Sequence, residues 1–150
     1  MKFLNANTSN IDKINELILK SRSIWNYSLE YFIESKSAVT IDEKYIQENL
    51  CFEIWISELV GFFAITKDPN SRFLDHLWIA KEKVNQGYGR ATIDFIDSLA
   101  KSQGWNYLYV FPDPPAEGFY LKTGFNDTGK RSPSRFKGGL IFSEFIKFYK

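Results

Sequence analysis

Two glycines, Gly87 and Gly89, stand one residue apart between a strand-like segment and a helix-like segment. Glycine lets the backbone turn tightly and approach a ligand, because no Cβ stands in the way. A helix that begins at this point directs unpaired N–H groups and the positive end of its dipole toward the loop. Such a loop is suited to binding a phosphate group. Since Gly-x-Gly also occurs in purely structural turns, the motif needs support from the elements around it.

Those elements can be read from the hydrophobic pattern. The apolar run 73–80 predicts the strand before the loop, and 87–103 predicts the helix after it, ended by Gly104. Beyond it, 107–111 predicts a strand and 116–122 a short helix. The other expected elements are strands at 2–6, 50–57, 59–66 and 140–148 and helices at 9–22, 23–37 and just after Thr40. This order predicts an α/β fold whose mixed sheet carries helices on both faces.

Composition restricts the class of protein. The 150 residues suit one domain, expected over 1–150, and 44% hydrophobic with 25% charged residues is typical of soluble globular proteins. A net charge of +1 argues against a nucleic-acid binder, although residues 130–137 include four basic side chains. One cysteine and one histidine argue against a His/Cys zinc site. No signal peptide and no apolar run near the roughly 18 residues of a membrane span are found, so a cytoplasmic protein is expected.

A second motif follows the glycine loop. It reads Ala116-Glu-Gly-Phe119-Tyr120-Leu-Lys-Thr-Gly124-Phe125. Together the two segments resemble the GNAT superfamily of N-acetyltransferases, whose pyrophosphate loop is Gln/Arg-x-x-Gly-x-Gly/Ala and whose second motif is Ala-x-x-Phe-Tyr-x-x-x-Gly-Phe. The resemblance is strong over 73–125, and segments 23–31, 74–79 and 132–138 are similar to one subset of these enzymes.

The resemblance implies a GNAT-like fold and acetyl-coenzyme A as cosubstrate, without a metal. It implies a mostly antiparallel, twisted sheet of about six or seven strands, in which the parallel strands 73–80 and 107–111 splay apart. Pantetheine would lie in that gap, and the pyrophosphate would accept N–H bonds from the glycine loop. The cofactor contacts so implied are Leu77, Trp78, Ile79, Val84, Gln86, Gly87, Tyr88, Gly89, Arg90, Asp113, Ala116, Phe119, Tyr120 and Lys122.

The sequence departs from the family at Val84, which stands where the family has Gln or Arg. Because the phosphate grip is mostly made by the main chain, we expect weakened rather than lost cofactor binding. Nearby Lys81, Lys83, Arg90 and Lys122 either supply positive charge to the phosphates or are solvated surface residues.

Acetyl transfer to an amine requires several groups. A lysine-like amine has a pKa near ~10.4, so a base or a water chain must take its proton. The tetrahedral intermediate needs N–H donors, which the splayed strand around 77–79 can provide. The departing thiolate benefits from a proton donor. Tyr120 matches the tyrosine that has this role in the family; the alternative is a helix tyrosine packed in the core.

The sequence identifies the general base less clearly than the proton donor. By spacing from the glycine loop, the glutamate that often serves in the family falls on Phe73, which cannot take a proton. Asp75, two residues on, faces the same side of the strand and is the first candidate. The alternatives are a structural carboxylate or a salt-bridge partner. His76 is expected on the opposite face as a core or surface histidine, and a bound water without a dedicated base remains open.

The resemblance implies that the helical region near the N-terminus covers the acceptor site, as it usually does in the family. We expect Trp25, Tyr27 and Tyr31, with Arg135, to line its pocket; the alternative is ordinary core aromatics. Asp113 stands where relatives often carry an asparagine that contacts the cofactor, or it simply sets the start of the next helix.

The sequence therefore predicts an N-acetyltransferase that moves an acetyl group from acetyl-coenzyme A to a primary amine of a small molecule or peptide. Direct attack in a ternary complex is expected, in a monomer or homodimer. A non-catalytic acetyl-coenzyme A sensor or interaction module is the alternative.

Overall fold

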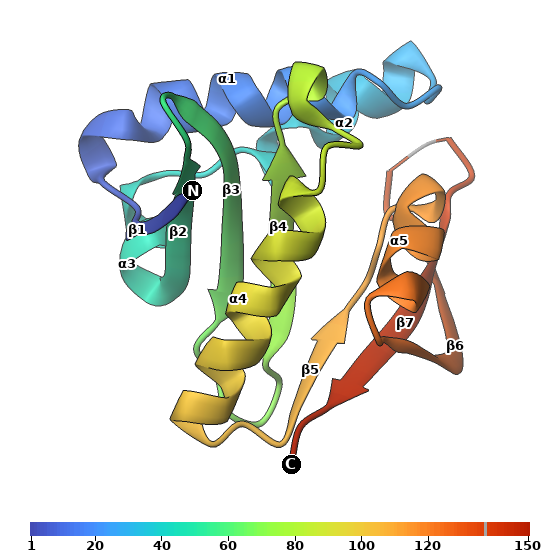
Figure 1. The fold of residues 1–150 in the computed structure, drawn as a ribbon. Coiled ribbons are helices and arrows are strands. Elements are labelled where there is room, and N and C mark those ends of the chain that lie inside the picture. The colour runs from blue at the N-terminus through green and yellow to red at the C-terminus, as the bar shows by residue number, and fades with distance from the viewer. Residues whose placement is uncertain (137) are drawn as a thin grey trace.

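A seven-stranded sheet forms the centre of the computed structural model, which describes residues 1–136 and 138–150 (Figure 1). The strands lie in the order β1-β2-β3-β4-β5-β7-β6, and every neighbouring pair is antiparallel except β4 with β5. Their bounds are β1 Lys2–Asn5, β2 Asn49–Trp55, β3 Leu59–Thr66, β4 Phe73–Ile79, β5 Tyr107–Val110, β6 Asn126–Pro133 and β7 Ile141–Phe148. The expected mixed, mostly antiparallel sheet is confirmed.

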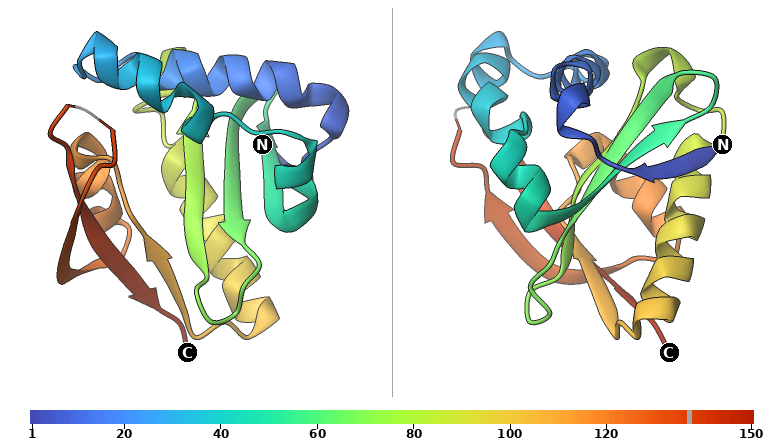
Figure 2. Two further views of the ribbon diagram at one scale, coloured as in Figure 1. Left: turned by 180° about the vertical axis from the view of Figure 1, so that it is seen from behind. Right: turned by 90° about the vertical axis from the view of Figure 1, so that its left-hand side faces the viewer.

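Helices cover both faces of this sheet, as predicted. The right-hand view of Figure 2 shows α1, α2 and α3 on one face and α4 and α5 on the other. The helices are α1 Ile11–Arg22, α2 Leu29–Val39, α3 Glu43–Glu48, α4 Tyr88–Gln103 and α5 Glu117–Lys122, with 3-10 turns at Thr8–Asn10, Lys81–Lys83 and Pro114–Ala116.

Each face has its own apolar core. Phe62 and Phe63 are consecutive residues of β3, both fully buried, and they belong to opposite cores because successive strand side chains alternate. Phe63 packs in the core that includes Ile96 of α4, whereas Phe62 packs in the core that includes Ile18 of α1. The sheet is thus held between two layers of helices.

The parallel pair is short. Strands β4 and β5 are in register only at Phe73 with Tyr109 and Leu74 with Val110. Strand β5 ends there, and Pro112 follows, which lacks the N–H that a ladder needs. Strand β4 continues to Ile79 without this neighbour, and the two strands diverge toward α1 in Figure 1. The expected splayed pair is present.

A β-bulge shifts the register within β4. Ala64 pairs with His76 but Ile65 pairs with Leu74, so Asp75 is the extra residue without a partner in β3. The bulge brings Asp75 and His76 to the same side, where both contact Tyr45: its hydroxyl donates to Asp75 and its ring meets the imidazole edge-on. The prediction that His76 lies on the face opposite Asp75 is therefore wrong.

Two other expectations about elements need correction. Strand β6 was not predicted, because all eight of its residues are exposed and no apolar alternation marks it. The helix expected at 23–37 begins only at Leu29, where the side chain of Ser28 accepts a hydrogen bond from the Tyr31 amide. Residues 23–28 form a non-helical connection between α1 and α2.

Candidate functional site

A cavity of about 500 Å³ opens where β4 and β5 separate. Its walls come from the end of α1 and the residues after it, β4, the first turn of α4, the segment after β5, and α5. The lining residues are Ser21, Ile24, Trp25, Leu74, Asp75, Leu77, Trp78, Ile79, Lys83, Val84, Asn85, Gly87, Gly89, Arg90, Val110, Phe111, Pro112, Asp113, Ala116, Phe119 and Tyr120.

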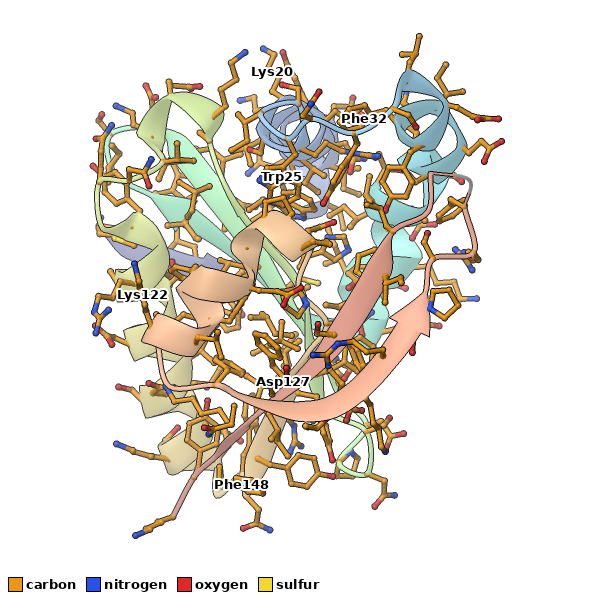
Figure 3. The ribbon with its side chains drawn as sticks, turned by 90° about the vertical axis from the view of Figure 1, so that its right-hand side faces the viewer. Lys20, Trp25, Phe32, Lys122, Asp127 and Phe148 are labelled. Atoms are coloured by element: carbon orange, nitrogen blue, oxygen red, sulfur yellow. The ribbon has the colours of Figure 1, made fainter. Side chains whose placement is uncertain are left out.

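Most residues predicted from the sequence to contact a cofactor lie in this lining. Three do not: Gln86, Tyr88 and Lys122. The side chain of Gln86 donates to the carbonyl of Glu82 instead. Lys122 extends from the outer side of α5 (Figure 3).

The glycine loop has the backbone that its sequence indicates. Gly87 has a φ of +88° and occupies the N-cap of α4, where no side chain caps the helix. The amides of the first turn therefore keep no intrahelical acceptor and point at the loop. Asn85 also lies in the left-handed region, at φ +61°, and lines the cavity. The sequence prediction missed Asn85, although asparagine tolerates this region better than most residues.

The two sequence motifs meet at Gly89. A Cβ on Gly89 would lie 3.1 Å from Cε1 of Phe119. The missing side chain lets α5 pack close against the first turn of α4. Lys83 and Arg90 line the cavity beside this contact, so this end of the cavity carries positive charge.

Tyr120 stands on the wall of the cavity and is only 6% exposed. Its ring packs edge-on against Phe119 and Phe125. Burial, and next the nearby charge of Asp113, raise the pKa of the Tyr120 phenol. The hydroxyl is therefore protonated at neutral pH.

Asp113 lies three residues after Val110, the end of β5, and lines the same cavity. The hydroxyl of Tyr27 donates to its Oδ1 at 3.2 Å. Burial raises the pKa of the Asp113 carboxyl to about 6, although the Tyr27 hydrogen bond and the charge of Arg22 both lower it. The backbone carbonyl of Asp113 accepts from the Ala116 amide, so the residue also begins the next turn.

Asp75 lines the cavity as well, but it is bound to its neighbours. Its Oδ2 accepts the Tyr45 hydroxyl and lies 3.8 Å from Nε2 of His76. His76 is 6% exposed, and its Nδ1 accepts from Nε1 of Trp78 at 2.9 Å. Burial lowers the pKa of His76, so the imidazole is neutral and packed in the core.

The aromatic residues predicted at the acceptor lie in different places. Trp25 lines the cavity between α1 and α5 (Figure 3). Tyr27 is not in the lining, but its hydroxyl donates a hydrogen bond to Asp113, which is. Tyr31 is buried between Tyr27 and Phe136, outside the lining. The guanidinium of Arg135 lies 4.8 Å from the Phe136 ring and also outside the lining. The basic run 130–137 includes Lys137, which lies outside the described residues.

Two further searches cover the described residues. Within 1–136 and 138–150, no group of three or more His, Cys, Asp or Glu side chains is arranged to hold a metal ion. None of the helices in these same ranges has the length and apolar character that crossing a membrane requires.

Comparisons with known proteins agree with this geometry. The model of the acetyltransferase (GNAT) domain matches residues 48–127, which is more than half of the chain. A search of curated proteins gave no match.

Solved structures share the fold at low sequence identity. A GCN5-related N-acetyltransferase from Rhodopseudomonas palustris has a TM-score of 0.82 and 21% identity, covering 99% of this chain and 95% of its own. The PaiA N-acetyltransferase from Thermoplasma acidophilum, in complex with coenzyme A, has a TM-score of 0.79 and 18% identity, with 99% and 98% covered. The ribosomal-protein-S18-alanine N-acetyltransferase from Escherichia coli has 0.71 and 15%, with 98% and 92% covered. With the family model matched over 48–127, this chain belongs to the GNAT family of acetyltransferases.

Proposed function

We propose that this protein is an N-acetyltransferase that moves an acetyl group from acetyl-coenzyme A to a primary amine of a small molecule or peptide. The observation that carries the proposal is the position of Tyr120. Its protonated phenol lines the same cavity as the uncapped first turn of α4 and the unpaired part of β4. One site thus offers a phosphate-binding loop, backbone donors and a proton donor.

The cofactor is proposed to bind with its pyrophosphate at α4. The helix dipole and the free amides after Gly87 favour an anion, and Lys83 and Arg90 add positive charge. The similar fold of PaiA, a structure in complex with coenzyme A, supports this assignment. Because Val84 lacks the polar side chain that the family has there, we expect a lower affinity rather than a different site.

Strand β4 is proposed to hold the acyl end. Leu77 pairs with Phe63 of β3, and Ile79 pairs with Gly61. On the opposite edge of β4, Leu77 and Ile79 do not pair with β5, and both residues line the cavity. Backbone groups on a free edge can pair with pantetheine as an added strand would. N–H groups at this edge can also stabilise the oxyanion of a tetrahedral intermediate.

The chemistry is proposed to be direct attack in a ternary complex. The amine nitrogen attacks the thioester carbonyl, and Tyr120 gives its proton to the departing thiolate. Trp25 and two carboxylates, Asp75 and Asp113, line the acceptor part of the cavity. Negative charge and an aromatic face both attract an ammonium group, which supports an amine acceptor.

The test joins binding to turnover. At ~100 times Kd, acetyl-coenzyme A should stabilise the fold by roughly 2.7 kcal/mol, a rise in Tm of about 5 to 10 °C. A panel of primary amines should then release free coenzyme A thiol and yield acetylated product by mass spectrometry. No thermal shift at millimolar ligand would exclude the proposal. A thermal shift without acetylation of any amine would favour the sensor alternative.

A further inference from the structure

We propose that Asp113 is the carboxylate that takes the proton from the acceptor ammonium and that Tyr27 positions it. This inference rests on the proposed function and assigns a group that the chemistry requires. The usual location for a base on β4 is occupied here by Phe73, whose ring packs against Phe111 and cannot accept a proton.

The position of Asp113 fits the task. The residue lies in the lining that also contains Tyr120 and Trp25, in the segment after Val110, the last residue of β5 that pairs with β4. Pro112 before it and Pro114 after it restrict the backbone on both sides. Within residues 1–136 and 138–150, the Tyr27 hydroxyl is the one hydrogen-bond donor to the carboxyl group, and it reaches Oδ1. Oδ2 has no hydrogen-bond donor among these residues, and it is the oxygen proposed to take the ammonium proton.

The other carboxylate of the cavity is less suited. Oδ2 of Asp75 already accepts the Tyr45 hydroxyl and is the carboxyl oxygen closest to the imidazole of His76. Tyr45 belongs to α3, so this bond fastens α3 to the bulge in β4. A carboxylate that holds two elements together has a structural function already.

The negative charge of Asp113 itself, rather than that of its neighbours, attracts a cationic acceptor. Arg22 of α1 and Tyr27 of the α1–α2 connection lower the pKa of Asp113, and the carboxylate in turn raises the pKa of Tyr31 of α2 and Tyr120 of α5. The three tyrosines are neutral at working pH, because burial raises the pKa of each phenol. Arg22 acts through space, while its Nη2 donates to Ser35. An ionised carboxylate away from water is stabilised by a close cation, and the acceptor ammonium supplies one.

The proton balance is complete. Asp113 takes one proton from R–NH3⁺ and becomes a neutral carboxylic acid. The nitrogen lone pair then forms a C–N bond with the thioester carbon, whose π electrons move to oxygen. Collapse breaks the C–S bond, and Tyr120 protonates the thiolate. The nitrogen loses its second proton to the Tyr120 phenolate, which restores the phenol. Asp113 returns its proton to water, so one proton is released for each amide formed.

The experiment is a pH profile of kcat/KM with an amine that the wild-type protein acetylates. The pKa of Asp113 is about 6, so wild-type kcat/KM should fall below pH 6, where the carboxyl holds a proton. Asp113→Asn should lower kcat/KM by about 10² to 10⁴-fold and remove this limb. Its activity should instead rise with pH toward the pKa of the amine, near ~10.4 for a lysine-like amine, since only the neutral amine then reacts.

Tyr27→Phe tests the positioning role. Its lost hydrogen bond normally lowers the pKa of Asp113, so the acid limb should move to higher pH. Tyr31→Phe is the matched control. It changes a neighbouring ring that makes no hydrogen bond to Asp113, so the limb should stay at the wild-type pH.

Different results separate the two proposals. An active wild-type protein whose Asp113→Asn variant keeps rate and limb, while Asp75→Asn loses both, would make Asp75 the base. If neither variant changes the profile, water takes the proton, and Asp113 is again excluded. A wild-type protein that acetylates no amine overturns the proposed function, and this inference falls with it. An unchanged melting temperature and acetyl-coenzyme A shift in Asp113→Asn show that the variant is folded and binds cofactor.

Discussion

Tyr120 and Asp113 line the same cavity, and burial is the main influence on the pKa of both side chains. Burial moves the pKa of both groups upward, because it disfavours the charged form of an acid. For the phenol this keeps the proton in place for donation. For the carboxyl it brings the pKa to about 6, close to working pH, where a general base is most effective. Desolvation thus keeps the Tyr120 phenol protonated and brings the Asp113 carboxyl close to the pH at which a general base works.

The phenol can be tested directly. Tyr120→Phe keeps the packed ring and removes only the hydroxyl, so kcat should fall by about 10²-fold or more while acetyl-coenzyme A binding is retained. Steady-state kinetics and a thermal shift measure the two quantities. Tyr107→Phe is the control, since its hydroxyl lies by the carbonyls of Pro69 and Asn70 outside the cavity. Full kcat in Tyr120→Phe would mean that another group, or water, protonates the thiolate.

At the scale of elements, patterns within one segment could be predicted from the sequence. The apolar spacing of α1 and α4, the turn at Gly87 and the succession of six of the seven strands along the chain follow from local periodicity and turn chemistry. The bulge at Asp75 could not, because it depends on how β3 pairs with β4. Strand β6 was also missed: its polar side chains carry no strand signal, and only pairing with β7 makes it a strand.

The same distinction applies to the candidate site, where contiguous motifs could be predicted and contacts between distant segments could not. The glycine loop and Tyr120 were found because they lie in contiguous motifs. The Tyr27–Asp113 hydrogen bond joins residues 86 positions apart, and no spacing rule connects them. Tyr31 was placed at the acceptor by its neighbourhood in sequence, although its ring is buried in an aromatic cluster. Pairings across the fold require the tertiary structure.

The two ends of α4 provide a matched test of the phosphate loop. Gly87 begins the helix at φ +88° and Gly104 ends it at φ +69°, and a Cβ at either would meet nothing within 4 Å. Alanine at each should therefore cost a similar backbone strain of about 1 to 2 kcal/mol. Only Gly87 lines the cavity, so Gly87→Ala should weaken acetyl-coenzyme A binding at least tenfold in a calorimetric titration, while Gly104→Ala should not. Equal affinities in the two variants would place the phosphates elsewhere.

At the scale of the whole molecule, the cavity lies on a seam. Strands β1 to β4 form one part of the sheet and β5, β7 and β6 the other, joined by the short parallel register of β4 and β5. A polar cluster crosses this seam. Lys147 of β7 donates to Asp97 of α4 and to the carbonyl of Thr123 after α5, and Tyr149 also donates to Asp97. The cluster connects α4, which packs on the first part, with the last strand of the chain.

Asp97→Asn should therefore weaken the joint between the two parts of the sheet. The Lys147 and Asp97 side chains are 16% and 21% exposed, so the variant leaves a largely buried ammonium without its counter-charge. We expect a loss of about 1.5 to 3 kcal/mol in the free energy of unfolding, or roughly 3 to 12 °C in Tm. Glu16→Gln is the control: its pair with Lys20 has side chains 63% and 68% exposed, so its loss should change the free energy of unfolding much less than Asp97→Asn does. Because solvent and salt screen the exposed pair, added salt should reduce the small effect of Glu16→Gln and leave that of Asp97→Asn nearly unchanged. Equal destabilisation by the two variants would show that the cluster does not secure the seam.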